Sequence, residues 1–266
     1  MPSPKVSVTP SGAVVLIEIN RPAVRNAVDN ETAEALAEAF RNFDSDPDAK
    51  VAVFAGKGST FCAGADLKEM ANGQRRKRWR ESFDGPMGPT RLGLSKPVIG
   101  AIEGHAVAGG LELALWCDLR IAASDAVFGV FNRRWGVPLL DGGTVRLPRL
   151  VGIGRALDIV MTGRSVSAEE ALRIGLVTEL TGPGAAVQRA TDLAYTLAAL
   201  PQEAMNLDRQ SIYRQAGQSL SEAMGEEFNH GFTAEGVESG AARFVGGAGR
   251  HGAPAMADTP HGGKRK

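Results

Sequence analysis

Two stretches of the sequence share one plan, and this shared plan restricts the fold more than any other feature. Residues 51–70 (VAVFAGKGSTFCAGADLKEM) and 98–115 (VIGAIEGHAVAGGLELAL) each read as a buried strand, a glycine-containing turn and a helix start. We expect the helices to start at about Ala65 and about Gly109. Buried strands that alternate with helices are typical of a parallel sheet covered by helices. The sequence therefore predicts an α/β architecture.

Other segments continue this alternation. The sequence predicts strands at 13–20, 51–55 and 96–104, one or two more within 119–129, and helices at 31–43 and 168–174. The first helix places Leu36, Phe40 and Phe43 at helical spacing. Ser167 and Glu170 have the spacing of a capping box, and Gly175 is a plausible end for the second helix.

The last third of the sequence has a different character. Beyond about residue 185 the apolar residues follow a helical period, and strand-like runs are absent. From Gly246 the chain has too few apolar residues to offset the entropy lost on ordering. We predict a core at 1–195, a helical region at 196–245 and a mobile tail at 246–266.

Charge and cysteine content exclude several classes of function. Thirty basic residues balance thirty acidic ones, so no overall field steers the protein toward nucleic acid or a membrane surface. Cys62 and Cys117 lie in apolar settings without metal-ligand spacing, which is typical of a reducing compartment. The sequence has no signal-like segment and no span of about 18 apolar residues. We expect a cytoplasmic protein that binds neither nucleic acid nor membrane and needs no metal.

The two helix starts suggest a binding site for an oxyanion. The first N–H groups of a helix have no partner within the helix and lie at its positive end. Two such ends side by side would hold one oxyanion between two donors. The alternative is that the glycine pairs only make tight turns.

Glu112 is an ionisable residue in an otherwise apolar helix. Its neighbours Leu111, Leu113, Leu115 and Trp116 surround the helix, which implies burial. Burial raises the pKa of a carboxyl group, and a general acid or base near neutral pH needs such a shift. The alternative is an ordinary acidic residue at a helix start.

The sequence resembles the enoyl-CoA hydratase/isomerase (crotonase) superfamily over roughly residues 5–245. The resemblance is carried in order by NRP (20–22), NA (26–27), FCAGADLKE (61–69), KPVI (96–99), GHAVAGGLELA (104–114), CD (117–118), GGTVRL (142–147), 157–163 and 168–177. It implies a crotonase-like spiral of repeated ββα units. It also implies that the C-terminal helices build a homotrimer or a dimer of trimers.

The resemblance further implies an acyl-CoA thioester as substrate, with coenzyme A present only as part of the substrate and no separate cofactor. Ala65 and Gly109 match the residues whose N–H groups bind the thioester oxygen. Glu112 matches one of two glutamates that activate water and move a proton. The family's CoA contacts fall at Arg25, Ala63, Asp66, Leu67 and Lys68, although Arg25 and Lys68 could equally be solvated surface charges.

The sequence departs from the family at the second glutamate, where the alignment without gaps places Asn132. An amide can orient water but cannot exchange a proton at neutral pH. Asp141 lies within one residue of a position where some members have a catalytic aspartate. The alternative for Asp141 is a turn or an N-cap before Gly142. Arg133 and Arg134 lie in the same loop and could pair with Asp141 or Glu112.

Three functions follow from these residues. The leading hypothesis is an enoyl-CoA hydratase of fatty acid or lipid metabolism that adds water to a trans-2-enoyl-CoA. The second is an enoyl-CoA or dienoyl-CoA isomerase that works with a single carboxylate. The third is a catalytically weak acyl-CoA-binding protein. His105, Cys62 and Cys117 are predicted to be structural, and the basic run at 75–80 to be a solvated helix face.

Overall fold

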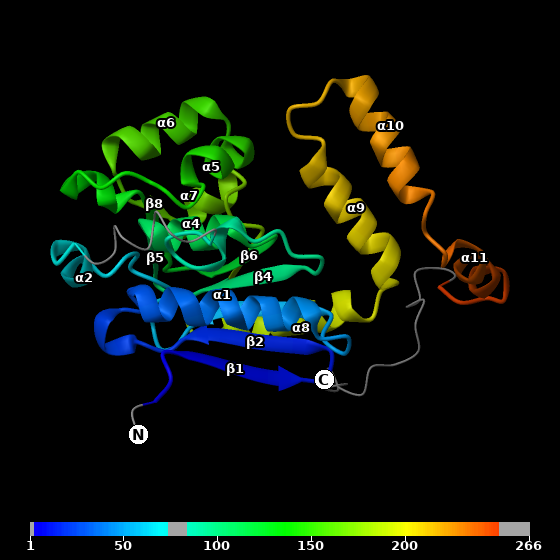
Figure 1. Ribbon diagram of the computed structural model, residues 1–266, viewed down its shortest axis with the longest axis horizontal. Helices are drawn as coiled ribbons and strands as arrows, with labels where there is room; N and C mark the ends of the chain where they lie inside the picture. Colours follow the sequence, from blue (N-terminus) through cyan, green and yellow to red (C-terminus); the bar gives the residue numbers. More distant parts are fainter. Residues whose placement is uncertain (1–2, 74–83, 250–266) are drawn as a thin grey trace. The chain divides into compact units, whose positions relative to one another are not determined.

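The computed structural model describes residues 3–73 and 84–249 (Figure 1). The chain divides into two compact units, Met1–Ala194 and Tyr195–Lys266. The basic run at 75–80 and most of the predicted tail, 250–266, lie outside the described residues. Within the described part of the chain, no helix is both long enough and apolar enough to cross a membrane.

A six-stranded sheet is the centre of the first unit. Its strand order is β1-β2-β3-β4-β6-β9, and every neighbouring pair is parallel except β1 with β2. The strands are β1 (Val6–Ser11), β2 (Val14–Ile19), β3 (Val51–Gly56), β4 (Val98–Ile102), β6 (Leu119–Ala123) and β9 (Glu179–Thr181). All residues of β3 and β4 are buried, as expected for strands that are covered on both faces.

A second, three-stranded sheet has the order β5-β7-β8. It consists of β5 (His105–Val107), β7 (Val127–Gly129) and β8 (Val166–Ser167). Strand β5 follows β4 after two residues and leads directly into helix α4. This short sheet therefore fixes where α4 begins.

The first unit contains helices and 3-10 turns between these strands. They are η1 (Pro22–Val24), α1 (Asn30–Ser45), α2 (Leu67–Ala71), η2 (Pro89–Arg91), α4 (Gly109–Trp116), η3 (Phe131–Trp135), α5 (Gly143–Val151), α6 (Ile153–Thr162), α7 (Ala168–Arg173) and most of α8 (Ala186–Ala198). Helix α1 buries Leu36, Phe40 and Phe43. The Phe40 ring makes edge contacts with Phe54 of β3 at 5.2 Å and with Trp116 of α4 at 4.7 Å between centroids. The sheet and α4 therefore share one aromatic core.

The second unit is helical. It contains α9 (Gln202–Arg214), α10 (Leu220–Gly231) and α11 (Val237–Val245). Ser219 and Glu222 form a complete capping box at the start of α10. The described residues beyond 185 contain no strand, as the sequence predicted. The oligomerisation role of 196–245 stays a prediction.

The structure corrects three details of the predicted elements. Helix α2 starts at Leu67 rather than at about Ala65, because Ala65 forms a β-bridge with Val28 and Asp66 accepts a hydrogen bond from the Lys68 N–H as N-cap. The capping box at Ser167 is half formed. Ser167 accepts from the Glu170 N–H, but the Glu170 carboxylate binds Arg164 at 2.7 and 2.8 Å. Strands β1, β5, β8 and β9 were not predicted.

Candidate active site

The two stretches with the same plan lie side by side in the structure. The Cys62 N–H donates to the His105 carbonyl at 2.9 Å, and the Val107 N–H donates to the Cys62 carbonyl at 3.2 Å. At the start of α4 the backbones come so close that a Cβ on Gly110 would lie 2.1 Å from the Cys62 oxygen. Only glycine allows this approach. The glycine-containing turn at 61–66 is therefore held against the N-terminus of α4.

Ala65 and Gly109 line one cavity of about 100 Å³. A Cβ built on Gly64 would lie 3.1 Å from the Gly109 nitrogen, which places the two turns in contact. Within the described part of the chain, neither the Ala65 nor the Gly109 N–H donates a hydrogen bond. The cavity therefore has two backbone donors available for an acceptor.

Ala108 holds the turn before α4 in an unusual backbone conformation. Its φ is 54° and its ψ is −126°, a region that residues with a side chain rarely adopt. Such a conformation costs about 1–3 kcal/mol and is kept only where the surroundings impose it. Here the Ala108 N–H donates to the Gly129 carbonyl of β7 at 2.9 Å. Pairing with the small sheet thus stabilises the turn that presents Gly109.

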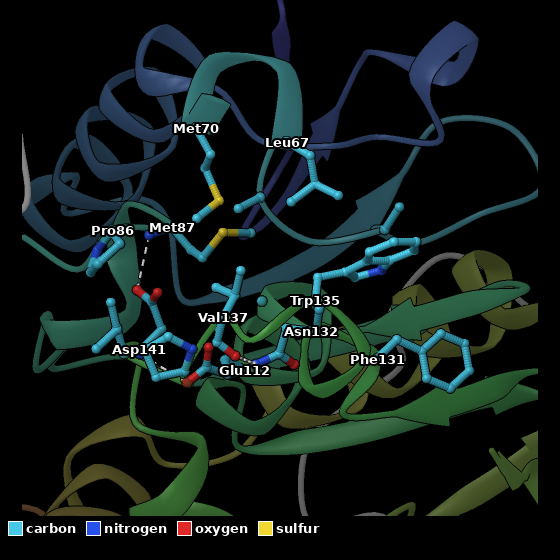
Figure 2. A pocket seen from close by; sticks show the side chains of 16 residues that line it. Leu67, Met70, Pro86, Met87, Glu112, Phe131, Asn132, Trp135, Val137 and Asp141 are labelled. Carbon is cyan, nitrogen blue, oxygen red and sulfur yellow. Dashed lines mark hydrogen bonds between the residues drawn. The ribbon is translucent and has the colours of Figure 1, made fainter. Parts of the chain in front are cut away.

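Glu112 lies in the first turn of α4, and its side chain faces the cavity (Figure 2). It is 3% exposed, and its Oε1 accepts hydrogen bonds from the N–H groups of Asp141 and Gly143, both at 2.8 Å. Burial, and after it the negative charge of Asp141, raise the pKa of the Glu112 carboxyl from 4.5 to about 7, against the opposing effect of the N–H donors. Glu112 can therefore accept or release a proton near neutral pH.

Asp141 also lines the cavity and is 4% exposed. Its Oδ1 accepts from the Met87 N–H at 2.9 Å and from the Thr90 hydroxyl. The alternative reading of Asp141 as an N-cap is wrong, because the N-cap of α5 is Gly142, and among the described residues no side chain caps that helix. The carboxylate instead connects the 137–143 loop to the segment around η2.

Asn132 is buried in η3 and also lines the cavity. Its Nδ2 donates to the Val137 carbonyl at 2.7 Å, while its buried Oδ1 has no partner among the described residues. Exchanging Oδ1 and Nδ2 would place the Asn132 Oδ1 against the Val137 carbonyl oxygen, and two acceptors cannot form a hydrogen bond. The orientation of the amide is therefore fixed by Val137. The structure thus brings Glu112, Asn132 and Asp141 to one cavity.

The remaining cavity wall is mostly apolar. In Figure 2, Met70 and Leu67 lie at the top of the view, Met87 and Val137 near its centre, and Trp135 and Phe131 to the right. The Trp135 side chain is 71% exposed although it lines the cavity, and Leu67 is 51% exposed. An apolar lining with a few converging polar groups is typical of a small-molecule site.

The residues predicted to contact CoA lie around the glycine-containing turn at 61–66. Ala63 and Leu67 line the cavity, and the Ala63 N–H donates to the Arg25 carbonyl at 3.0 Å. Arg25 and Lys68 are exposed. Asp66 caps α2 and forms an ion pair with Arg21 at 3.2 Å. These five residues are thus close in space, and their contact with CoA stays a prediction.

The hydrogen bonds of two arginines near the cavity test one prediction from the sequence. The suggestion that Arg133 and Arg134 pair with Glu112 or Asp141 is wrong. Arg133 donates to the Val160 carbonyl and Arg134 to the Gly163 carbonyl, both near the end of α6. Two other arginines donate to the backbone of the 137–143 loop: Arg146 to the Asp141 carbonyl at 2.9 Å and Arg91 to the Leu140 carbonyl at 3.5 Å.

Sequence reasoning did not identify Met87, Thr90 or Arg146 as parts of the site. The first two belong to a segment without helical or strand periodicity, and no short motif marks them. Cys62 and Cys117 are buried, as predicted for core residues. His105 lies on β5 with an exposed side chain and is absent from the cavity lining.

Comparison with known proteins gives a consistent result. The family model described as enoyl-CoA hydratase/isomerase matches residues 9–246. Enoyl-CoA hydratase EchA19 of Mycobacterium tuberculosis is 36% identical over 74% of this chain and 75% of its own length. The short-chain-enoyl-CoA hydratase of Clostridium acetobutylicum is 33% identical over 88% and 92%. Carnitinyl-CoA dehydratase of Salmonella typhi is 38% identical over 73% and 75%.

Solved structures agree with these relatives. The crystal structure of enoyl-CoA hydratase EchA1 from Mycobacterium marinum matches with a TM-score of 0.85 and 35% identity. The match covers 92% of this chain and 96% of that chain.

Proposed function

This chain belongs to the enoyl-CoA hydratase/isomerase family, and on that premise we propose that it is an enoyl-CoA hydratase that adds water to a trans-2-enoyl-CoA. One observation carries the proposal: a buried carboxyl group, Glu112, borders the same cavity as two available backbone donors. The names of the similar hydratases support the reaction type.

In the proposed reaction the thioester oxygen accepts hydrogen bonds from the Ala65 and Gly109 N–H groups. When water adds to C3 of the substrate, the electrons of the double bond move onto this oxygen and form an enolate. Donors that are already in place stabilise such a charge, and one donor contributes about 2.7–4 kcal/mol in well-studied enzymes. The enolate then takes a proton at C2.

Glu112 is the proton-transfer group in this proposal. A pKa of about 7 lets it take a proton from water and return one to C2 at neutral pH. Asn132 could orient the water through its amide but could not supply a proton. The match of this sequence to the family without gaps places Asn132 where the second glutamate would lie. We therefore propose a mechanism in which Glu112 is the one carboxylate that transfers protons.

In this proposal, the CoA part of the substrate lies near the glycine-containing turn at 61–66. The exposed cations Arg25 and Lys68 are proposed to meet its phosphates, and the apolar wall with Leu67, Met87 and Trp135 to contact the acyl chain. A cytoplasmic location and a homotrimer or dimer of trimers remain parts of the proposal.

A hydration assay tests this function. We would follow the conjugated-thioester absorbance of crotonyl-CoA and of a mid-chain enoyl-CoA after adding the protein. We expect the absorbance to fall, and we expect Glu112→Gln to lower kcat/KM by about 10²-fold or more, the usual effect of a positioned acid or base. Glu38→Gln, on the exposed face of α1, is the matched control and should keep full activity. An unchanged rate in Glu112→Gln would reject the role of Glu112.

Enoyl-CoA isomerisation is the second candidate, and Asn132 is the observation that favours it. Moving a double bond needs one carboxylate to shuttle a proton and adds no water. A 3-enoyl-CoA would then gain the conjugated absorbance and keep it. CoA ligands that bind without any turnover would instead favour the weak acyl-CoA-binding protein.

A further inference from the structure

A second carboxylate, Asp141, is buried in the cavity wall beside Glu112. We propose that Asp141 is a positioning residue: its carboxyl group acts electrostatically on the buried Glu112 carboxyl beside it, and its hydrogen bonds fix the segment 85–90, which forms the facing wall. Its effect on catalysis rests on the proposed function, but its effect on Glu112 exists in the free protein.

The hydrogen bonds of Asp141 fix its carboxyl group in place. Oδ1 accepts from both the Met87 N–H and the Thr90 hydroxyl, and donors of this kind favour the charged form. Figure 2 shows the Asp141 side chain directed toward the Met87 backbone. The arrangement therefore commits one carboxylate oxygen to an anchoring role.

The anchored segment is built closely around this carboxylate. A Cβ on Gly85 would lie 2.6 Å from Asp141 Oδ1 and 1.7 Å from Thr90 Oγ1. Met87 then lies over the start of α4, because a Cβ on Gly109 would lie 2.7 Å from the Met87 sulfur. Asp141 thus connects the segment 85–90, which covers Gly109, to the 137–143 loop.

The same residue contacts Glu112 through its backbone. The Asp141 N–H donates to Glu112 Oε1 at 2.8 Å, so the two carboxyl groups occupy one buried region. A like charge nearby disfavours ionisation of a carboxyl group, and Asp141 contributes in this direction to the raised pKa of Glu112. The hydrogen bond from the Asp141 N–H fixes the position of the Glu112 carboxyl group. The charge of the Asp141 side chain affects the pH at which Glu112 ionises.

Other charged or titratable groups on the elements that pack against α4 are few. Arg146 donates to the backbone carbonyls of Asp141 and Thr90, and Arg91 of η2 donates to the Leu140 carbonyl at 3.5 Å. Arg149 of α5 and His105 of β5 are exposed. Asp141 is therefore the acidic group expected to act on Glu112.

Titration of Glu112 in the free protein tests the proposal. Protein labelled with ¹³C at the glutamate carboxyl groups would be titrated by NMR, with Glu112→Gln to assign the signal. In Asp141→Asn the amide oxygen can still accept from Met87 and Thr90, but the charge is gone. We expect the Glu112 midpoint to fall by about one unit or more. The Glu112-dependent limb of the pH profile of kcat/KM should move by the same amount.

Thr90→Val is the matched control, because it removes one anchoring bond and keeps the charge. It should leave the Glu112 midpoint unchanged. The proposal is overturned if Asp141→Asn leaves the midpoint in place, or if Thr90→Val moves it equally. If Asp141→Asn does not fold, ¹³C-labelled aspartate in the unsubstituted protein decides instead: Asp141 must titrate below Glu112, and a midpoint above it rejects the proposal. Neither titration needs a substrate, so both are independent of the reaction assigned to the enzyme.

Discussion

At the scale of the residue, the cavity combines two buried carboxylates with different surroundings. Glu112 accepts hydrogen bonds from backbone N–H groups, whereas Asp141 also accepts from a hydroxyl. Each hydrogen bond satisfies a buried acceptor that would otherwise cost about 1–3 kcal/mol. The buried Oδ1 of Asn132 is the exception, because it has no partner among the residues that the structure describes. An unsatisfied group at this position fits a site that completes its hydrogen bonds with a ligand or water.

Glu112 makes the stability of the protein depend on pH. In the unfolded chain its carboxyl ionises with a pKa near 4.5, and in the folded protein near 7. The folded protein therefore keeps this proton up to a higher pH than the unfolded chain does. As a result, the free energy of unfolding falls as pH rises from 4.5 to 7. The shift corresponds to a loss of about 3 kcal/mol, which persists above pH 7.

We therefore expect Glu112→Gln to become more stable relative to the unsubstituted protein as pH rises. The difference in unfolding free energy between the two proteins should change in favour of the variant by up to about 3 kcal/mol between pH 4.5 and pH 8. Urea unfolding at both pH values measures it. A difference that does not vary with pH would show that Glu112 ionises normally in the folded protein.

At the scale of the element, α4 is short and supported at both ends. Its C-terminus is covered by Arg120, which is 3% exposed and donates to the carbonyls of Cys117 at 2.6 Å and Leu176 at 2.7 Å. A cation near a helix C-terminus is also favourable for the helix dipole. Its N-terminus lies against Cys62. The eight residues of α4 thus hold Glu112 and Gly109 in fixed positions.

Gly110→Ala tests how strongly the site depends on this contact. The added Cβ would meet the Cys62 carbonyl oxygen at 2.1 Å and its carbon at 2.8 Å, both backbone atoms that cannot move aside. We expect the two turns to separate, with a loss of about 1–3 kcal/mol of unfolding free energy and about 10²-fold in kcat/KM.

Gly154→Ala in α6 is the control, because its Cβ would meet no atom within 4 Å. It should be neutral or stabilise the protein by up to about 1 kcal/mol, since alanine favours helix. Equal stability and activity in both variants would mean that the contact at Gly110 is not required.

At the scale of the whole molecule, the fold matches the family spiral, and the predicted fold class is confirmed by the similar crystal structures. Several apolar side chains of α10 and its C-cap are exposed in the single chain: Leu220, Met224, Phe228 and, at the C-cap, Phe232. Phe228 and Phe232 stack at 5.7 Å between ring centroids and are 67% and 80% exposed. Exposed apolar groups of this size usually mark an interface.

We expect the protein to sediment as a trimer or hexamer, and we expect the double substitution Phe228→Ser and Phe232→Ser to weaken the assembly. Loss of two phenylalanine side chains from an interface removes apolar area that contributes about 25 cal/mol per Å². Sedimentation velocity over a concentration series measures the change. Glu227→Gln on the same helix is the control, and a monomeric unsubstituted protein would refute the prediction.

Much of the framework could be predicted because it depends on local patterns. The apolar runs at 14–19, 51–56 and 98–102 and the period of Leu36, Phe40 and Phe43 are visible in any window of the sequence. Strand β1 was missed because it is mostly exposed and contains Pro10, and it forms only as the antiparallel partner of β2. The short strands β5, β8 and β9 likewise depend on distant partners.

The sequence by itself determined the α/β framework, the start of α4 at Gly109 and the burial of Glu112, because each follows from neighbouring residues. Only the tertiary structure decided what surrounds Glu112. Asp141 is 29 residues away along the chain and Met87 is 54 residues from Asp141, yet hydrogen bonds join them at one cavity. The charge and hydrogen bonds that set a proton affinity act through space, and the order of residues along a chain does not contain those distances.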